Sequence, residues 1–156
     1  MKTKLLLLLI AAAMLCGCDP MGNKIAYYTF MNETDKTIVV NLYDQNYYES
    51  PAMQIPEDAE PIYSFTIAAG EKFTKILPPA YDRFGKDSIL NPFDDIKAGC
   101  ISVSNGELII VQSYRGFLCN GASYEITQNT KDATYLQYIF TEEFFNDFGL
   151  PVPVYE

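Results

Sequence analysis

The sequence predicts an all-β fold, a single antiparallel β-sandwich of immunoglobulin-like type with a short C-terminal helical turn. Tyr, Phe, Ile, Val and Thr alternate with polar residues over short stretches, which is the pattern of strands with one buried face. Turn residues divide this pattern into seven or eight strands, and one helical pattern follows near the C-terminus. Two packed antiparallel sheets accommodate such a series of strands.

The first half of the predicted sandwich has four strands. Between residues 36 and 43, for example, Ile38, Val40 and Leu42 fall on one face. Gly70 can supply a positive φ in the turn between the third and fourth strands. The predicted strands are residues 25–32, 36–43, 62–67 and 72–77, and the predicted long connections are residues 44–61 and 80–98.

The second half is predicted to begin with a hairpin. Asn105-Gly106 suits a tight turn of two residues, which pairs Ser104 with Glu107 and places Cys100 opposite Val111. The Asn120-Gly121 turn precedes two further strands. The strands predicted in this half are residues 100–104, 107–114, 123–127 and 134–140.

A short helix is predicted after the last long strand. Thr141 is the expected N-cap, because its hydroxyl can accept a hydrogen bond from a free backbone amide of the first turn. Glu142 and Glu143 follow it, where the helix dipole favours negative charge. Gly149 and Pro151 are expected to end the helix.

The N-terminus carries the pattern of an export signal. A basic start precedes a wholly apolar run over residues 5–15, which is too short to span the roughly 30 Å core of a bilayer. The run ends in Leu15-Cys16-Gly17-Cys18, which resembles the bacterial lipobox, in which a diacylglycerol is attached to the thiol and the signal is cleaved just before it. A plain secretory signal and a core helix are the alternatives. The expected division is a signal peptide at 1–17, a lipid-anchored tether at 18–23 and a sandwich domain at 24–156.

Cys18 is therefore the expected lipidation site, and the membrane is the first expected partner. The full chain has a formal net charge of −9, and loss of Lys2 and Lys4 with the signal makes the mature domain more acidic still. Such a domain repels nucleic acid and anionic headgroups, so the lipid must hold it to the membrane and no nucleic-acid partner is expected. The expected location is the cell envelope, at the outer membrane in its periplasmic or surface-facing leaflet.

Cys100 and Cys119 are the only cysteines left once Cys16 is removed and Cys18 is acylated. Because the compartment beyond the inner membrane is oxidising, a disulfide between them is expected, worth about 3 kcal/mol in the chain-entropy model. Two separate buried thiols are the alternative, because the sequence does not fix their separation.

The chain contains no histidine, which excludes Ser-His-Asp and Cys-His nucleophiles and the usual zinc sites. We expect no enzyme, no cofactor and no metal. A glycoside hydrolase built on a carboxylate pair survives this exclusion as the least favoured function. An irregular calcium site at Asp94-Asp95 beside Asn91, or at Glu57-Asp58 with Glu60, is weighed against ordinary solvated loops.

Tyr43, Tyr47 and Tyr48 form an aromatic cluster beside Asn46 in a predicted loop. Tyrosine combines a stacking face with a polar tip, so this cluster is the candidate ligand-binding site for a sugar or a protein. It supports the alternative function of a carbohydrate-binding surface module. The competing structural interpretation is that the rings fold back over the edge of the sandwich.

The chain has short motifs at residues 30–40, at 65–71, and at 124–127 through 138–143. Together they resemble the small uncharacterised lipoproteins of the Bacteroidetes cell envelope, in which a strand ending in Phe-Thr-Glu-Glu precedes an aromatic-bearing last turn. The usual Pro-Gly-Glu turn is here Ala69-Gly70-Glu71, and the pair of domain cysteines is not a feature of the group. The resemblance implies an envelope location and a sandwich fold, and it brings no catalytic residues.

The same lineage implies an O-glycosylation site at Ser88. Asp87-Ser88-Ile89 fits the Asp-Ser/Thr-apolar pattern of periplasmic O-glycosylation in Bacteroidetes, within a predicted connection that can accommodate a glycan. The expected function is a non-catalytic interaction or accessory module, with an envelope protein or a glycan as its partner.

Overall fold

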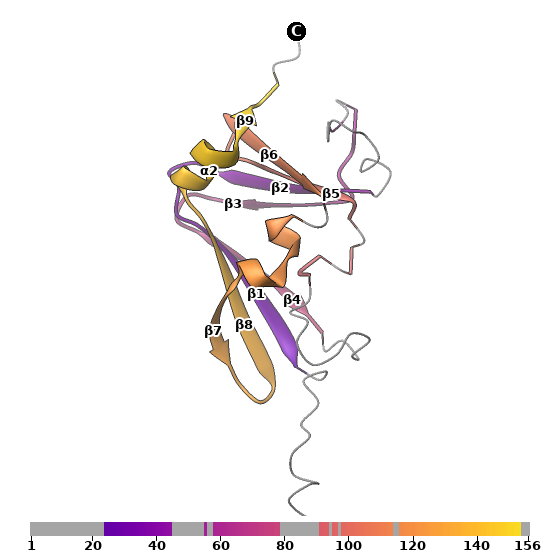
Figure 1. Ribbon diagram of the computed structural model, residues 1–156, viewed down its shortest axis with the longest axis vertical. Coiled ribbons are helices and arrows are strands. Elements are labelled where there is room, and N and C mark those ends of the chain that lie inside the picture. Colours follow the sequence, from indigo (N-terminus) through magenta and orange to yellow (C-terminus); the bar gives the residue numbers. More distant parts are fainter. Residues whose placement is uncertain are drawn as a thin grey trace, which may run out of the picture.

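The computed structural model describes residues 24–44, 55, 58–78, 91–93, 95–96, 98–113 and 116–153. Within these residues, nine strands form two sheets that face each other across one core (Figure 1). Sheet A has the strand order β4-β1-β8-β7, and sheet B has the order β3-β2-β5-β6-β9. The all-β, sandwich-like part of the prediction is therefore confirmed.

Most elements lie where the alternation of apolar residues predicted them. The predicted bounds of β1, β4 and β5 are reproduced, whereas the other strands differ by one or a few residues, and β9 was not predicted. The strands are β1 Ile25–Asn32, β2 Ile38–Tyr43, β3 Tyr63–Ile67, β4 Lys72–Leu77, β5 Cys100–Ser104, β6 Leu108–Ser113, β7 Glu125–Asn129, β8 Ala133–Phe140 and β9 Leu150–Pro151. The helices are η3 Phe117–Cys119, η4 Gly121–Ser123 and α2 Glu142–Phe148.

The prediction of a purely antiparallel sandwich is wrong at the centre of sheet A. β1 pairs antiparallel with β4, but it pairs parallel with β8 through eight register pairs, from Ile25–Ala133 to Asn32–Phe140. A parallel pair needs a long connection rather than a tight turn. That condition is met because the chain between β1 and β8 builds the whole of sheet B except β9.

The register of the β5–β6 hairpin also differs from the prediction. Ser104 pairs with Ile109, and Cys100 pairs with Ser113. The prediction that Cys100 lies opposite Val111 is therefore wrong by two residues.

The Asn105 side chain explains this shift. Its Oδ1 accepts hydrogen bonds from the backbone amides of Glu107 and Leu108, at 3.1 and 2.8 Å. The Asn105 backbone amide also donates to the Leu108 carbonyl, so these two residues face each other. The turn residues are therefore Gly106 and Glu107, with Gly106 at a φ of 92°, a conformation that glycine adopts without strain.

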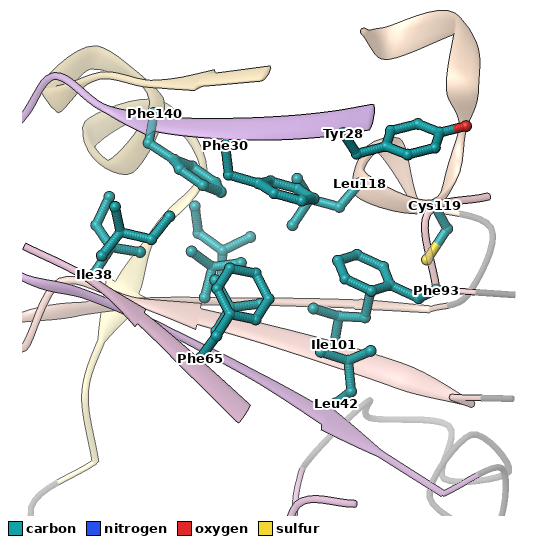
Figure 2. Packing of buried hydrophobic residues seen from close by; sticks show 14 of the residues in the cluster. Tyr28, Phe30, Ile38, Leu42, Phe65, Phe93, Ile101, Leu118, Cys119 and Phe140 are labelled. Atoms are coloured by element: carbon teal, nitrogen blue, oxygen red, sulfur yellow. The ribbon is translucent and has the colours of Figure 1, made fainter. Parts of the chain in front are cut away.

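The core lies between the two sheets (Figure 2). Phe30 and Phe140 point from sheet A toward Ile38 and Phe65 of sheet B. Phe93, from the predicted connection before β5, packs against two of these rings, with its ring centroid 5.7 Å from that of Phe30 and 6.3 Å from that of Phe65. A segment with no strand pattern thus supplies one of the most buried aromatic rings of the described residues.

The predicted helix is confirmed. The Thr141 hydroxyl accepts a hydrogen bond from the Phe144 amide at 3.2 Å, and the Gly149 amide donates to the Phe145 carbonyl where the helix ends. Phe144 and Phe145 are buried against the core. In the described part of the chain, no helix is long and apolar enough to cross a membrane.

A buried asparagine, Asn32, connects the two turns in which the chain passes between the sheets. Asn32 Nδ2 donates to the carbonyls of Lys36, Ile67 and Ala68, at 2.7, 2.9 and 3.1 Å. Its Oδ1 accepts from the amide and the hydroxyl of Thr34. One side chain therefore satisfies backbone groups in both the β1–β2 and the β3–β4 turns.

Candidate functional site

The parallel β1–β8 pair defines two opposite ends of the domain, which we call poles (Figure 1). Both strands start at the pole formed around residue 24, which we call the proximal pole. Both end at the opposite pole, where Thr141 leads directly from β8 into α2. We call this end the distal pole. The proximal pole comprises residues 24–26, 76–78 and 129–133, and the distal pole comprises residues 141–151.

The distal pole exposes two large apolar side chains. Phe148 at the end of α2 is 61% exposed and Leu150 in β9 is 70% exposed, the two highest values for large apolar residues in the described regions. The Phe148 ring lies 6.2 Å from Phe117 and 5.9 Å from Phe144, measured between centroids. Leu150 is fixed by pairing with Ile109 of β6. Both side chains are therefore held on an ordered framework.

The sequence carried a signal for this patch that the prediction did not use. Phe148 lies four residues after Phe144, so the two rings share one face of the helix. The aromatic residues of the last turn named in the family resemblance are Phe144 and Phe145, which are buried, and the exposure of Phe148 was not predicted. Leu150 could not be found in this way, because its position depends on pairing with β6.

The tyrosine cluster does not gain support as a ligand site. Tyr43 is the last residue of β2 and is only 7% exposed, so the expectation that its ring is available for stacking is wrong. Strand pairing with Cys100 of β5 holds it in the sheet. Tyr47 and Tyr48 lie outside the described residues, as do Cys18 and Ser88.

The predicted disulfide is not formed, because Cys100 and Cys119 are both free and buried. Alternation along β5 explains this: Ile101 and Val103 belong to the core between the sheets, so Cys100 points to the outer face of sheet B. Cys119 lies in the core beside Phe93 (Figure 2). The two thiols therefore occupy opposite sides of one sheet.

Neither thiol has the properties of a nucleophile. Burial raises the pKa of Cys119 to about 12, although a hydrogen bond with Asn91 acts in the opposite direction. Burial also raises the pKa of Cys100 above its ordinary value. Because the thiolate is the reactive form, both side chains act as packing residues at neutral pH.

The acidic loops do not converge on a metal site within the described residues, where no three His, Cys, Asp or Glu side chains come together. Asp95 instead accepts a hydrogen bond from Lys75 at 2.9 Å, and that ammonium lies 5.3 Å from the Tyr63 ring centroid. Asn91 Oδ1 accepts from the Phe93 amide at 2.8 Å. These contacts hold the segment that contains Phe93 against the core. Asp94 and Glu57 lie outside the described residues.

A comparison of the chain with family models, with curated proteins and with solved structures found no match.

Proposed function

We propose that this chain is a lipid-anchored cell-envelope protein whose domain is a non-catalytic interaction module. The anchor rests on the lipobox-like Leu15-Cys16-Gly17-Cys18 and the apolar run before it. The interaction role rests on one observation of the structure, the exposed apolar pair Phe148 and Leu150. Exposed apolar side chains that lie together are typical of protein-binding surfaces, and Phe148 and Leu150 are two residues apart at one end of the domain. The partner is a protein of the same envelope compartment.

The immunoglobulin-like classification is part of this proposal. It is supported by two facing sheets and by a chain that passes repeatedly between them. The parallel β1–β8 pair distinguishes the domain from the constant-type arrangement, in which strand pairs are antiparallel.

The anchor is tested by replacing Cys18 with serine in the full chain. Wild-type protein is expected to incorporate labelled palmitate and to have a mature N-terminus at Cys18. The Cys18→Ser variant is expected to stay unprocessed and unlabelled. Wild-type protein that takes up no palmitate and whose N-terminus maps elsewhere would contradict the anchor.

The interaction surface is tested by a photoreactive phenylalanine analogue at position 148 in cells. We expect a crosslink to one envelope protein, with a several-fold lower yield in the Leu150→Ser background. Ile126 of β7 is also about half exposed and lies outside the distal pole, so Ile126→Ser is the matched control that leaves the yield unchanged. Equal yields in both backgrounds would contradict a distal binding surface.

A further inference from the structure

The proximal pole is assembled from three parts of the chain that are far apart in sequence. Ile25, the first residue of β1, pairs with Ala133 of β8, and its amide donates to the Asp132 carbonyl at 3.0 Å. Ala26 pairs with Leu77, the last residue of β4. The start of β1, the end of β4 and the β7–β8 turn therefore share one end of the domain (Figure 1).

The surface of this pole combines an aliphatic side chain with lysines. Ile76 is 57% exposed, and Lys131 is exposed in the β7–β8 turn beside Asp132. Lys24 Nζ donates to Asn129 Oδ1 at 3.0 Å, which holds its ammonium at the same pole. An exposed apolar side chain and lysines at the same end of a domain are the chemistry that suits a bilayer surface, because lysine stems can lie along apolar surface while their ammonium groups reach phosphates.

The distal pole has the opposite charge. Glu142, Glu143 and Asp147 are exposed on α2, which carries no basic residue. An anionic membrane surface therefore repels the distal pole, whereas it attracts Lys24 and Lys131 at the proximal pole. The charge distribution thus gives the acidic domain a preferred orientation.

The tether length restricts which surface can reach the bilayer. Seven residue steps separate Cys18 from Ile25, and they span at most about 25 Å when fully extended. A flexible chain of that length has a root-mean-square span of about 15 Å. The distal pole lies farther away by the length of β8, about 23 Å at 3.3 Å per residue.

We propose that the proximal pole rests on the lipid bilayer, with Ile76 at the level of the headgroups and with Lys24 and Lys131 facing lipid phosphates. This inference rests on the proposed acylation of Cys18. It deepens the proposed function because it directs the Phe148–Leu150 surface away from the membrane, toward a protein partner.

The test places an environment-sensitive fluorophore at Ile76→Cys or at Leu150→Cys in the mature acylated protein, reconstituted in vesicles that contain phosphatidylglycerol. The native domain cysteines are buried, so the new thiol is the labelling site. We expect a blue-shifted emission at position 76, quenched several-fold more strongly by nitroxide-bearing lipid than emission at position 150. The Lys24→Glu, Lys131→Glu double variant is expected to lose that quenching in anionic vesicles.

Equal quenching at positions 76 and 150 in acylated, vesicle-bound protein would overturn the orientation while leaving the anchor intact. Mass spectrometry of the same preparation reports the acyl chain separately, and its absence would overturn the anchor and the orientation together. Quenching at position 76 that survives charge reversal would support the orientation of the proximal pole and contradict the role of the two lysines.

Discussion

At the scale of single residues, the Asn32 side chain bonds four backbone groups. Replacing it with alanine leaves the carbonyls of Lys36, Ile67 and Ala68 and the amide of Thr34 without this partner in a buried setting. We expect Asn32→Ala to lower the free energy of unfolding by about 2–4 kcal/mol. Urea denaturation followed by tyrosine fluorescence measures the change.

The isosteric variant Asn32→Asp separates shape from hydrogen bonding. A carboxylate can accept from Thr34 but cannot donate to three carbonyls, so we expect a loss at least as large as that of Asn32→Ala. Asn129→Ala is the control, because the side chain of this exposed residue bonds the side-chain ends of Lys24 and Thr134. Similar losses in Asn32→Ala and Asn129→Ala would contradict the role of Asn32.

At the scale of elements, the join between α2 and β9 depends on Gly149. A Cβ at this position would lie 2.5 Å from the Phe145 carbonyl oxygen and 2.9 Å from Leu108 Cβ. We expect Gly149→Ala to displace β9 and to destabilise the domain by about 1–3 kcal/mol. Faster hydrogen exchange of the Val152 amide, which donates to the Glu107 carbonyl at 2.9 Å, reports the displacement. Asp147→Ala, on the exposed face of α2, should change neither measurement.

Elements that depend on local chemistry were predictable, and those that depend on pairing were not. β1, β4 and β5 have their predicted bounds because alternation is a property of neighbouring residues. The hairpin register was predicted wrongly because it depends on which backbone amides bond the Asn105 side chain. β9 has only two residues and exists through pairing with β6, so it leaves no pattern of its own.

The candidate site was less predictable than the fold. The sequence drew attention to Tyr43, whose aromatic character suits either a ligand site or a packed position, and the structure shows that its side chain is buried. Cys100 and Cys119 could be paired by elimination, but the side of sheet B on which each lies depends on the strand register. Predicting the exposed surface at Phe148 requires knowing which face of α2 is covered by the rest of the domain.

At the scale of the whole molecule, buried thiol and phenol groups make the free energy of unfolding depend on pH in the alkaline range. Burial raises the pKa of Cys119 to about 12 and raises those of Tyr28, Tyr124 and Tyr138 well above the ordinary tyrosine value. The folded state therefore retains protons that the unfolded chain loses above about pH 9 to 10. We expect the free energy of unfolding to fall as pH rises through this range, by up to about 1.4 kcal/mol per pH unit for each group.

Urea denaturation at neutral pH and at about pH 11 measures this dependence. Cys119→Ala and Tyr138→Phe each remove one such proton, so each variant should show a shallower decline than the wild type. A free energy of unfolding that is constant across the alkaline range would contradict the prediction.

The parallel alignment of β1 and β8 also gives the domain a mechanical property. A force applied between the start of β1 and α2 pulls β1 by its start and β8 by its end. Because the two strands run in the same direction, this force slides them past each other in shear. Their eight register pairs then resist together, rather than separating one after another as they do when a hairpin is pulled open. If the N-terminus is anchored and α2 binds a partner as proposed, the domain would transmit tension between the two without separating β1 from β8 one register pair at a time.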